Sequence, residues 1–131
     1  MSGNAPRWHN WAGTQTATPR EVSSPRSAGE VAAAVRRAAD RGLTVRMTGS
    51  GHSFTGAAVT DGIMLRPGGM AGIRSVDATA GRITVEAGCL LRDLNEVLAR
   101  RGLALANMGD IQMQTVAGAI QTGTHGTGRD L

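Results

Sequence analysis

One stretch of the chain, residues 43–56, constrains the fold more than any other. It begins with an apolar run from Leu43 to Met47 that contains the β-branched Val45, and this composition favours an extended backbone. Three glycines follow directly: Gly49, Gly51 and Gly56. Glycines after a strand allow successive backbone N–H groups to converge on an anion, because no Cβ restricts the φ angle. The spacing therefore predicts a phosphate-binding loop, and a diphosphate suits it best.

This stretch has two other interpretations besides a phosphate-binding loop. Segments rich in glycine and serine are more often ordinary loops than nucleotide sites, and a lone Gly-x-Gly is a weak signal. The glycine spacing also departs from Gly-x-Gly-x-x-Gly, and no helical pattern follows it. The stretch is therefore not the dinucleotide fingerprint of a Rossmann fold.

The composition limits the classes of partner. A chain of 131 residues suits one small domain, and an aromatic content of 2% requires a core of aliphatic side chains. All 14 basic residues are arginines, and they are scattered along the chain without a basic run or stacking aromatics. The net charge of +4 therefore does not indicate a nucleic-acid partner.

Cysteine and histidine usage argues against disulfides and metals. Cys89 is the single cysteine, so neither a disulfide framework nor a thiolate metal cluster is expected. The histidines His9, His52 and His125 have no metal-ligand spacing. The N-terminus lacks the apolar segment of a signal peptide, and no apolar run approaches membrane-spanning length. We expect a cytoplasmic protein without a membrane span.

Two helices are predicted from their ends. Ser27 and Glu30 have the spacing of a capping box, and Gly42 ends the helix that follows. Residues 90–101 form the second predicted helix, which ends at Gly102. The first helix has an apolar face at helical spacing: Val31, Ala34, Val35, Ala38 and Ala39. The second has Leu91, Leu94, Val97 and Leu98.

The remaining elements are short strands and a polar start. Residues 63–65 are predicted as a buried strand, and residues 73–77 and 82–86 as a hairpin. Residues 14–22 are expected to be extended. Residues 1–13 are expected to form an N-terminal arm that Trp8 and Trp11 pack onto the rest of the domain. This order of strands and helices predicts an α+β fold.

A second glycine-rich segment lies near the end of the sequence. Residues 116–120 predict one turn of helix, whose N-terminal amides would face a phosphate or a flavin carbonyl. Gly123, Gly126 and Gly128 permit close backbone approach. His125 by itself is more typical of a structural hydrogen bond than of catalysis.

Together, the two segments are more specific than either alone. Residues 49–54 and 115–128 resemble the flavin domain of the vanillyl-alcohol-oxidase type, also called the PCMH-type FAD-binding domain. Within it, the chain is most similar to the aldonolactone and alditol oxidases, the group of L-gulono-1,4-lactone oxidase and D-arabinono-1,4-lactone oxidase. Residues 8–11, the helix after Ser27 and residues 60–64 also fit this group.

The resemblance implies which residues bind FAD. In the first segment, backbone amides would hold the diphosphate within Thr48, Gly49, Ser50, Gly51, His52 and Ser53. In the second, the flavin and the rest of the diphosphate would be lined by Gly109, Asp110, Thr115, Gly118, Thr122, Gly123, Thr124, His125 and Gly126. Many members attach the flavin 8α-methyl group covalently to a histidine at the position of His52.

The implied reaction moves a hydride from the CH–OH carbon of a sugar lactone or polyol to flavin N5, and then electrons to oxygen or another acceptor. In the related enzymes, a side chain at the position of Gly109 can block oxygen, so its glycine favours an oxidase. The resemblance assigns no catalytic residue here.

The resemblance covers only the N-terminal part of such an enzyme. We expect residues 1–131 to be the first part of an FAD-binding domain, without the rest of that domain and without a substrate domain, and to be inactive alone. Apolar surface should then be exposed. The alternative is a non-catalytic fragment that binds a nucleotide or a partner protein.

Overall fold

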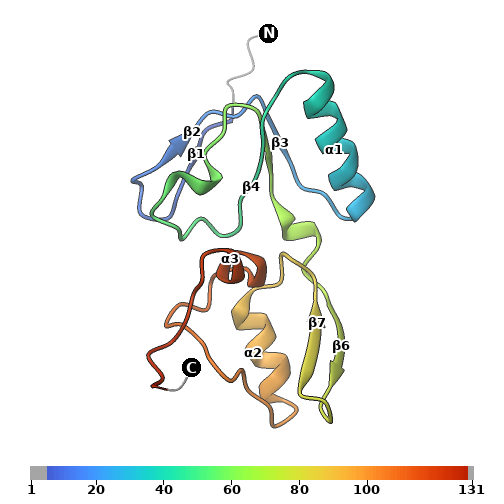
Figure 1. Ribbon diagram of the computed structural model, residues 1–131, viewed down its shortest axis with the longest axis vertical. Coiled ribbons are helices and arrows are strands. Elements are labelled where there is room, and N and C mark those ends of the chain that lie inside the picture. Colours follow the sequence, from blue (N-terminus) through green and yellow to red (C-terminus); the bar gives the residue numbers. More distant parts are fainter. Residues whose placement is uncertain (1–5, 130–131) are drawn as a thin grey trace. The chain divides into compact units, whose positions relative to one another are not determined.

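The computed structural model describes residues 6–129 (Figure 1). The chain divides into two compact units, residues 1–69 and residues 70–131. The N-terminal unit contains β1 (Trp8–His9), β2 (Thr16–Ala17), β3 (Glu21–Ser23), α1 (Ala28–Asp40), β4 (Val45–Met47), the 3-10 helix η1 (Gly56–Ala58), β5 (Ile63–Leu65) and η2 (Pro67–Gly69). The C-terminal unit contains β6 (Ile73–Asp77), β7 (Arg82–Val85), α2 (Leu91–Ala99) and α3 (Val116–Gln121).

The N-terminal unit is built around β5, the central strand of a parallel sheet with the order β3-β5-β4. Successive side chains of a strand point to opposite faces of the sheet. Ile63 and Leu65 pack against Ala34 and Ala38 of α1, whereas Met64 packs against the hairpin of β1 and β2. β5 is therefore buried on both faces, which explains its unbroken apolar sequence.

The ends of α1 confirm the predicted capping residues. Ser27 is the N-cap, and its hydroxyl accepts a hydrogen bond from the Glu30 amide. The Glu30 carboxylate accepts from the Arg26 amide, one residue before the N-cap, so the predicted return bond is shifted by one position. Gly42 has φ +60° and forms a Schellman ending, in which the Leu43 amide donates to the Ala38 carbonyl.

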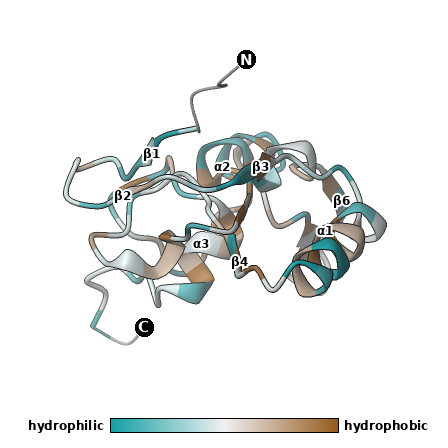
Figure 2. Ribbon diagram, turned by 90° about the horizontal axis from the view of Figure 1, so that it is seen from above, coloured by the Kyte–Doolittle hydropathy of each residue, from teal (hydrophilic) through white to brown (hydrophobic). Residues whose placement is uncertain are grey.

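The apolar face of α1 is narrower than predicted. Ala34 and Ala38 are buried, but Val35 is 48% exposed and Ala39 is also exposed. Of the predicted apolar face, Ala34, Ala38 and the partly buried Val31 pack against the sheet, whereas Val35 and Ala39 lie beyond this stripe. Figure 2 shows the alternation of hydrophilic and hydrophobic residues along this helix.

Near the start of the described residues, a short hairpin joins the N-terminal unit. Trp8 and His9 pair with Ala17 and Thr16 in an antiparallel hairpin. Trp8 is buried against Met64 and Ala17, as predicted. Trp11 is 66% exposed and lies outside the core, and its ring contacts the ring of His52 instead. The prediction for residues 1–5 lies outside the described residues.

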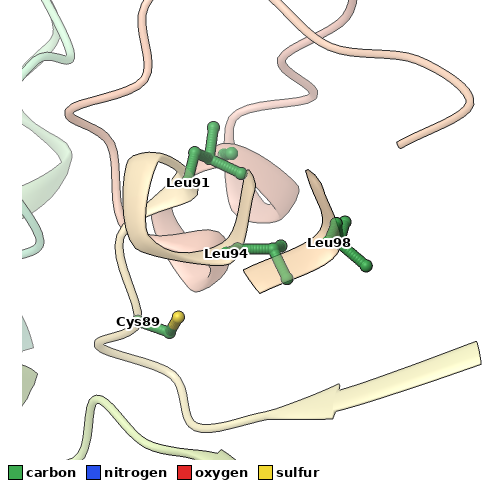
Figure 3. Packing of buried hydrophobic residues seen from close by; sticks show 5 residues of the cluster. Cys89, Leu91, Leu94 and Leu98 are labelled. Carbon is green, nitrogen blue, oxygen red and sulfur yellow. The ribbon is translucent and has the colours of Figure 1, made fainter. Parts of the chain in front are cut away.

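The C-terminal unit has its own hydrophobic core around α2. Leu91, Leu94 and Leu98 project from α2 and cluster with Cys89 and with Ala119 of α3 (Figure 3). Fully burying a leucine side chain contributes about 2 kcal/mol. The predicted hairpin is confirmed as β6 and β7, with Gly81 at φ +61° in its turn.

These elements confirm the predicted α+β class. In the described part of the chain, no helix is long and apolar enough to cross a membrane.

Candidate functional site

The residues predicted to bind FAD form two groups, one in each unit. We call residues 48–53 the first glycine loop and residues 107–126 the second glycine segment. The first glycine loop directly follows β4, as the sequence predicted. The second glycine segment contains α3 and the turns on both sides of it. Each group is held by hydrogen bonds within its own unit.

The first glycine loop is anchored at its start and through its carbonyl groups. The buried Thr48 donates its amide to the Leu65 carbonyl of β5, with an N···O distance of 2.9 Å. Further along, the Gly51 carbonyl accepts from the Trp11 amide at 2.8 Å. The Ser53 carbonyl accepts from Asn10 Nδ2 at 3.0 Å. These bonds fix the loop without using its amides beyond Thr48.

The amides that follow Thr48 are available to a ligand. Within residues 6–129, no hydrogen bond is donated by the amides of Gly49, Ser50, Gly51, His52 or Ser53. Gly51 has φ +74°, a conformation that L side chains rarely adopt. A continuous run of unused N–H groups with a glycine in the left-handed region is what anion-binding loops provide.

His52 is half-buried and stacks against Trp11. The centroids of the two rings are 5.5 Å apart, with an interplanar angle of 31°. His52 Nδ1 is buried and has no hydrogen-bond partner among the described residues. Buried polar atoms are almost always paired in folded proteins. An unpaired ring nitrogen therefore points to a group that uses it.

The second glycine segment uses the amides of α3 and of the turn after it internally, whereas within residues 6–129 the amides of residues 107–115 donate to nothing. Thr115 is the buried N-cap of α3, and its hydroxyl accepts from the Gly118 amide at 3.1 Å. The Val116 and Ala117 amides donate to the carbonyls of Cys89 and Ala87. The prediction that the first amides of this helix face a phosphate or a flavin carbonyl is therefore wrong. They tie α3 to the segment before α2.

The turn after α3 is also closed by the protein itself. The Gly123 and Thr124 amides donate to the Ile120 and Ala119 carbonyls, and Gly123 has φ +61°. The Thr122 and Thr124 hydroxyls lie 3.2 Å apart, and Gln114 Nε2 donates to Thr124 at 3.0 Å. The Thr122 hydroxyl donates to the Gly118 carbonyl at 2.9 Å, so the hydroxyls of this exposed turn are hydrogen-bonded within the protein as well.

Two glycines of the second glycine segment are required by close packing. A Cβ on Gly109 would lie 2.8 Å from the Thr124 methyl carbon. A Cβ on Gly126 would lie 2.6 Å from the Met108 carbonyl oxygen. The Gly126 amide donates to Asn107 Oδ1 at 2.7 Å, which brings the two ends of the segment together. His125 Nδ1 lies 2.8 Å from the Gly126 carbonyl, so its ring nitrogen has a structural contact, as predicted.

Asp110 is exposed, and none of the described hydrogen bonds or ion pairs involves its side chain. Cys89 is a buried free thiol beside α3. Burial raises the pKa of Cys89, and the nearby Asp93 carboxylate raises it further, so the thiol stays neutral. No group of His, Cys, Asp or Glu residues in the described part of the chain could hold a metal ion.

Sequence reasoning missed two asparagines that shape these segments. Asn10 is 1% exposed and ties the first glycine loop to the β1–β2 hairpin, and Asn107 closes the second glycine segment. An asparagine side chain can both donate and accept, but nothing in the sequence places Asn10 beside the loop. The partners lie too far along the chain for the sequence to identify them.

The comparisons with known proteins identify the family. The family model of the FAD binding domain matches residues 19–131. The chain belongs to the FAD-binding domain family. The L-gulono-1,4-lactone dehydrogenase of Mycobacterium tuberculosis is 46% identical over 124 residues, which are 95% of this chain and 29% of that protein. The L-gulonolactone oxidase of Mus musculus is 41% identical over 122 residues, which are 93% of this chain and 28% of that protein.

A solved structure supports the same fold. The cholesterol oxidase from B. sterolicum matches with a TM-score of 0.81 and 21% sequence identity, covering 92% of this chain and 24% of that chain. The resemblance to vanillyl-alcohol-oxidase-type flavoproteins is thereby confirmed, and FAD is the cofactor of this domain. The chain spans less than a third of the length of the two curated relatives described above.

The described residues of the FAD-binding domain fit this cofactor. The unused amides of residues 49–53 suit the negative charge of a diphosphate, and the unpaired Nδ1 of His52 lies in the same loop. In the second glycine segment the amides of residues 107–115 also donate to nothing within residues 6–129, whereas the Thr122 hydroxyl donates to the Gly118 carbonyl at 2.9 Å.

Proposed function

We propose that this chain is the FAD-binding part of an oxidoreductase that oxidises a CH–OH group of a sugar lactone or polyol. The two curated relatives described above are named for L-gulono-1,4-lactone or L-gulonolactone, and their printed names differ between dehydrogenase and oxidase. When bound, FAD accepts a hydride at N5 and passes electrons to oxygen or another acceptor. The observation that carries the proposal is the run of unused amides from Gly49 to Ser53.

Each group of residues has a distinct proposed role. The first glycine loop binds the diphosphate through backbone amides, because its carbonyl bonds to Trp11 and Asn10 keep the loop in place without using those amides. The second glycine segment supports the flavin through close packing at Gly109 and Gly126 and through the hydroxyls of Thr122 and Thr124. Asp110, in the second glycine segment, is proposed to contact the flavin.

His52 is proposed to bind the flavin covalently. A neutral imidazole would hold the flavin through a bond from one ring nitrogen to the carbon of the 8-methyl group, in place of one C–H bond of that methyl. The imidazole N–H proton and the methyl proton would be released, and the electron pair of the C–H bond would pass through the flavin to dioxygen, which would become hydrogen peroxide. The unpaired, buried Nδ1 supports His52 as the attachment residue.

Spectroscopy of the purified protein, expressed from its complete reading frame, tests the function. We expect visible flavin bands that bleach on anaerobic addition of L-gulono-1,4-lactone, D-arabinono-1,4-lactone or a polyol. Bands that appear but never bleach with any of these compounds would reject the substrate class while keeping FAD binding. A folded, colourless protein that takes up no added FAD would favour the alternative of a non-catalytic nucleotide-binding or partner-binding fragment.

A further inference from the structure

The turn that follows β1 holds the first glycine loop on both sides of His52. The Trp11 amide donates to the Gly51 carbonyl at 2.8 Å. Asn10 Nδ2 donates to the Ser53 carbonyl at 3.0 Å. Gly51 and Ser53 directly precede and follow His52. The backbone on either side of the histidine is therefore tied to two neighbouring residues of one turn.

Asn10 is the buried centre of this arrangement. It is 1% exposed, and its Oδ1 accepts from the Gln15 amide at 2.9 Å. Its Nδ2 also donates to the Thr14 hydroxyl at 3.0 Å. The Asn10 backbone bonds to Gln15 and Gly13 as well. A side chain so fully paired in a buried position fixes the turn from residue 10 to residue 15 in one conformation.

The Trp11 side chain contacts the ring of His52 and does not pack in the hydrophobic core. Its side chain is 66% exposed, so burial does not explain its position. Its indole instead lies 5.5 Å from the imidazole, centroid to centroid. One side of His52 is thus covered by an aromatic ring, while His52 Nδ1 stays buried and without a partner in the described part of the protein.

We propose that Asn10 and Trp11 are positioning residues for His52. The hydrogen bonds of the turn hold the loop backbone, and the indole holds the imidazole in one rotamer, so that together they set the orientation of the ring that meets the flavin. This inference rests on the proposed function, in which His52 binds the flavin. It adds that residues about forty positions earlier in the sequence set the geometry of that attachment.

The first test measures the His52 rotamer by NMR in the full chain without flavin. In the parent we expect one χ1 rotamer and nuclear Overhauser effects between the His52 and Trp11 rings. Trp11→Ala should give averaged couplings, and Trp11→Phe should restore a single rotamer. Phe54→Ala is the matched control, because Phe54 is also an aromatic residue with 66% exposure in the same unit. Identical His52 couplings in the parent and Trp11→Ala would overturn the inference.

The second test measures attachment in the protein expressed from its complete reading frame. Trp11→Ala should lower by several-fold the fraction of flavin that stays with acid-precipitated protein, while total flavin before precipitation is unchanged. Asn10→Asp should do the same, because a carboxylate cannot donate to the Ser53 carbonyl; far-UV circular dichroism checks its folding. An unchanged fraction in Trp11→Ala would overturn the inference. If the parent releases all its flavin, the covalent proposal fails, and the NMR test alone decides the positioning.

Discussion

The two glycine-rich segments look alike in sequence and differ in which backbone groups the fold uses. The first glycine loop is held through the carbonyls of Gly51 and Ser53, and within residues 6–129 its amides after Thr48 donate to nothing. In the second glycine segment the amides at the start of α3 and in the turn after it donate to carbonyls of the same unit or to the Thr115 hydroxyl.

The amides of residues 107–115 also donate to nothing within residues 6–129, so the contrast with the first glycine loop holds only for α3 and the turn after it. An N–H group that is already paired is a poorer donor to a ligand, whereas an unpaired one gains a hydrogen bond without losing another. Glycine serves the first loop by allowing a positive φ at Gly51, and it serves the second by allowing close approach at Gly109 and Gly126. Glycine content alone therefore does not identify an anion site.

The largest effect is expected on the content of covalently bound flavin, and it should differ between the histidines of the two segments. His52→Ala should abolish covalent flavin, because the unpaired Nδ1 is lost. His125→Ala should retain it, because His125 Nδ1 already contacts the Gly126 carbonyl. Flavin fluorescence of the denatured protein on a gel measures both. Covalent flavin that survives in His52→Ala, or that disappears in His125→Ala, would reverse the assignment.

The next effect concerns Gly51. Gly51→Ala should destabilise the protein by about 1 kcal/mol, because its φ of +74° disfavours a Cβ. Gly13→Ala, at φ +69° with open space around it, should cost the same and is the matched control. Only Gly51→Ala should also weaken FAD binding, measured by titration, and Gly51→Val should remove it.

The structure refines the reason for that loss. A Cβ on Gly51 would lie 3.5 Å from Trp8 Cζ2, in ordinary contact with the protein, so a clash with the protein is not the expected cause. The backbone conformation of the amides is what changes. Normal flavin content in Gly51→Val would show that Gly51 is only a turn residue.

A several-fold effect is expected at Gly109. Gly109→Ala should slow the reoxidation of reduced flavin by dioxygen, measured by stopped-flow mixing with aerated buffer. Its Cβ would lie 2.8 Å from the Thr124 methyl carbon, so the variant also displaces Thr124. Thr124→Ser, which removes that methyl group, is the control in the parent and in Gly109→Ala.

The double variant separates two causes. If Gly109→Ala with Thr124→Ser regains the parent rate, displacement of the second glycine segment explains the effect. If it stays slow, the added methyl itself obstructs oxygen. Equal rates in the parent and Gly109→Ala would exclude Gly109 as a control point, and slow reoxidation of the parent would indicate a dehydrogenase.

A smaller effect, on the free energy of unfolding, is expected when a helix cap is removed in either unit. Ser27→Ala and Thr115→Val each remove a hydroxyl that accepts from an amide of the first helical turn. Each should lower the free energy of unfolding by about 1 kcal/mol. Both tryptophans lie in the N-terminal unit, so tryptophan fluorescence reports on Ser27→Ala, and hydrogen exchange of the α3 amides reports on Thr115→Val. No change in α3 exchange would contradict the capping role of Thr115.

The smallest effect is a pH dependence in the N-terminal unit. The hydrogen bond from Arg37, and the charges of Arg37 and Arg41, lower the pKa of Glu21 below its model-compound value of 4.5. A lowered folded-state pKa contributes stability above the unfolded value, and this stability is lost as pH falls through the lowered pKa. Urea midpoints followed by tryptophan fluorescence should therefore fall from about pH 5 downward.

Glu21→Gln removes this contribution and should flatten the pH dependence. The loss is expected to be under about 1 kcal/mol, because both ion pairs of Glu21 are partly exposed. Glu86→Gln is the control, since Glu86 lies in the C-terminal unit, where the Gly72 amide and then Arg74 lower its pKa. An equal change in the fluorescence-detected midpoint for Glu86→Gln would contradict this assignment.

The sequence by itself determined the local elements and the family. Ser27, Gly42 and Gly102 set helix ends through contacts within a few residues, and β5 was identifiable from its apolar run. The resemblance of residues 49–54 and 115–128 to flavin domains was confirmed by the family match. These features depend on short-range hydrogen bonds and on periodicity, which the sequence contains directly.

Only the tertiary structure decided which backbone groups remain for a ligand. The first amides of α3 donate to the carbonyls of Cys89 and Ala87, which lie far away along the chain. The first glycine loop is likewise held by hydrogen bonds from the distant Asn10 and Trp11. The same holds for Val35, which has helical apolar spacing but lies beyond the stripe that the sheet covers. A hydrogen bond or an apolar contact between distant residues depends on the path of the chain in space, and this path is what local sequence patterns do not specify.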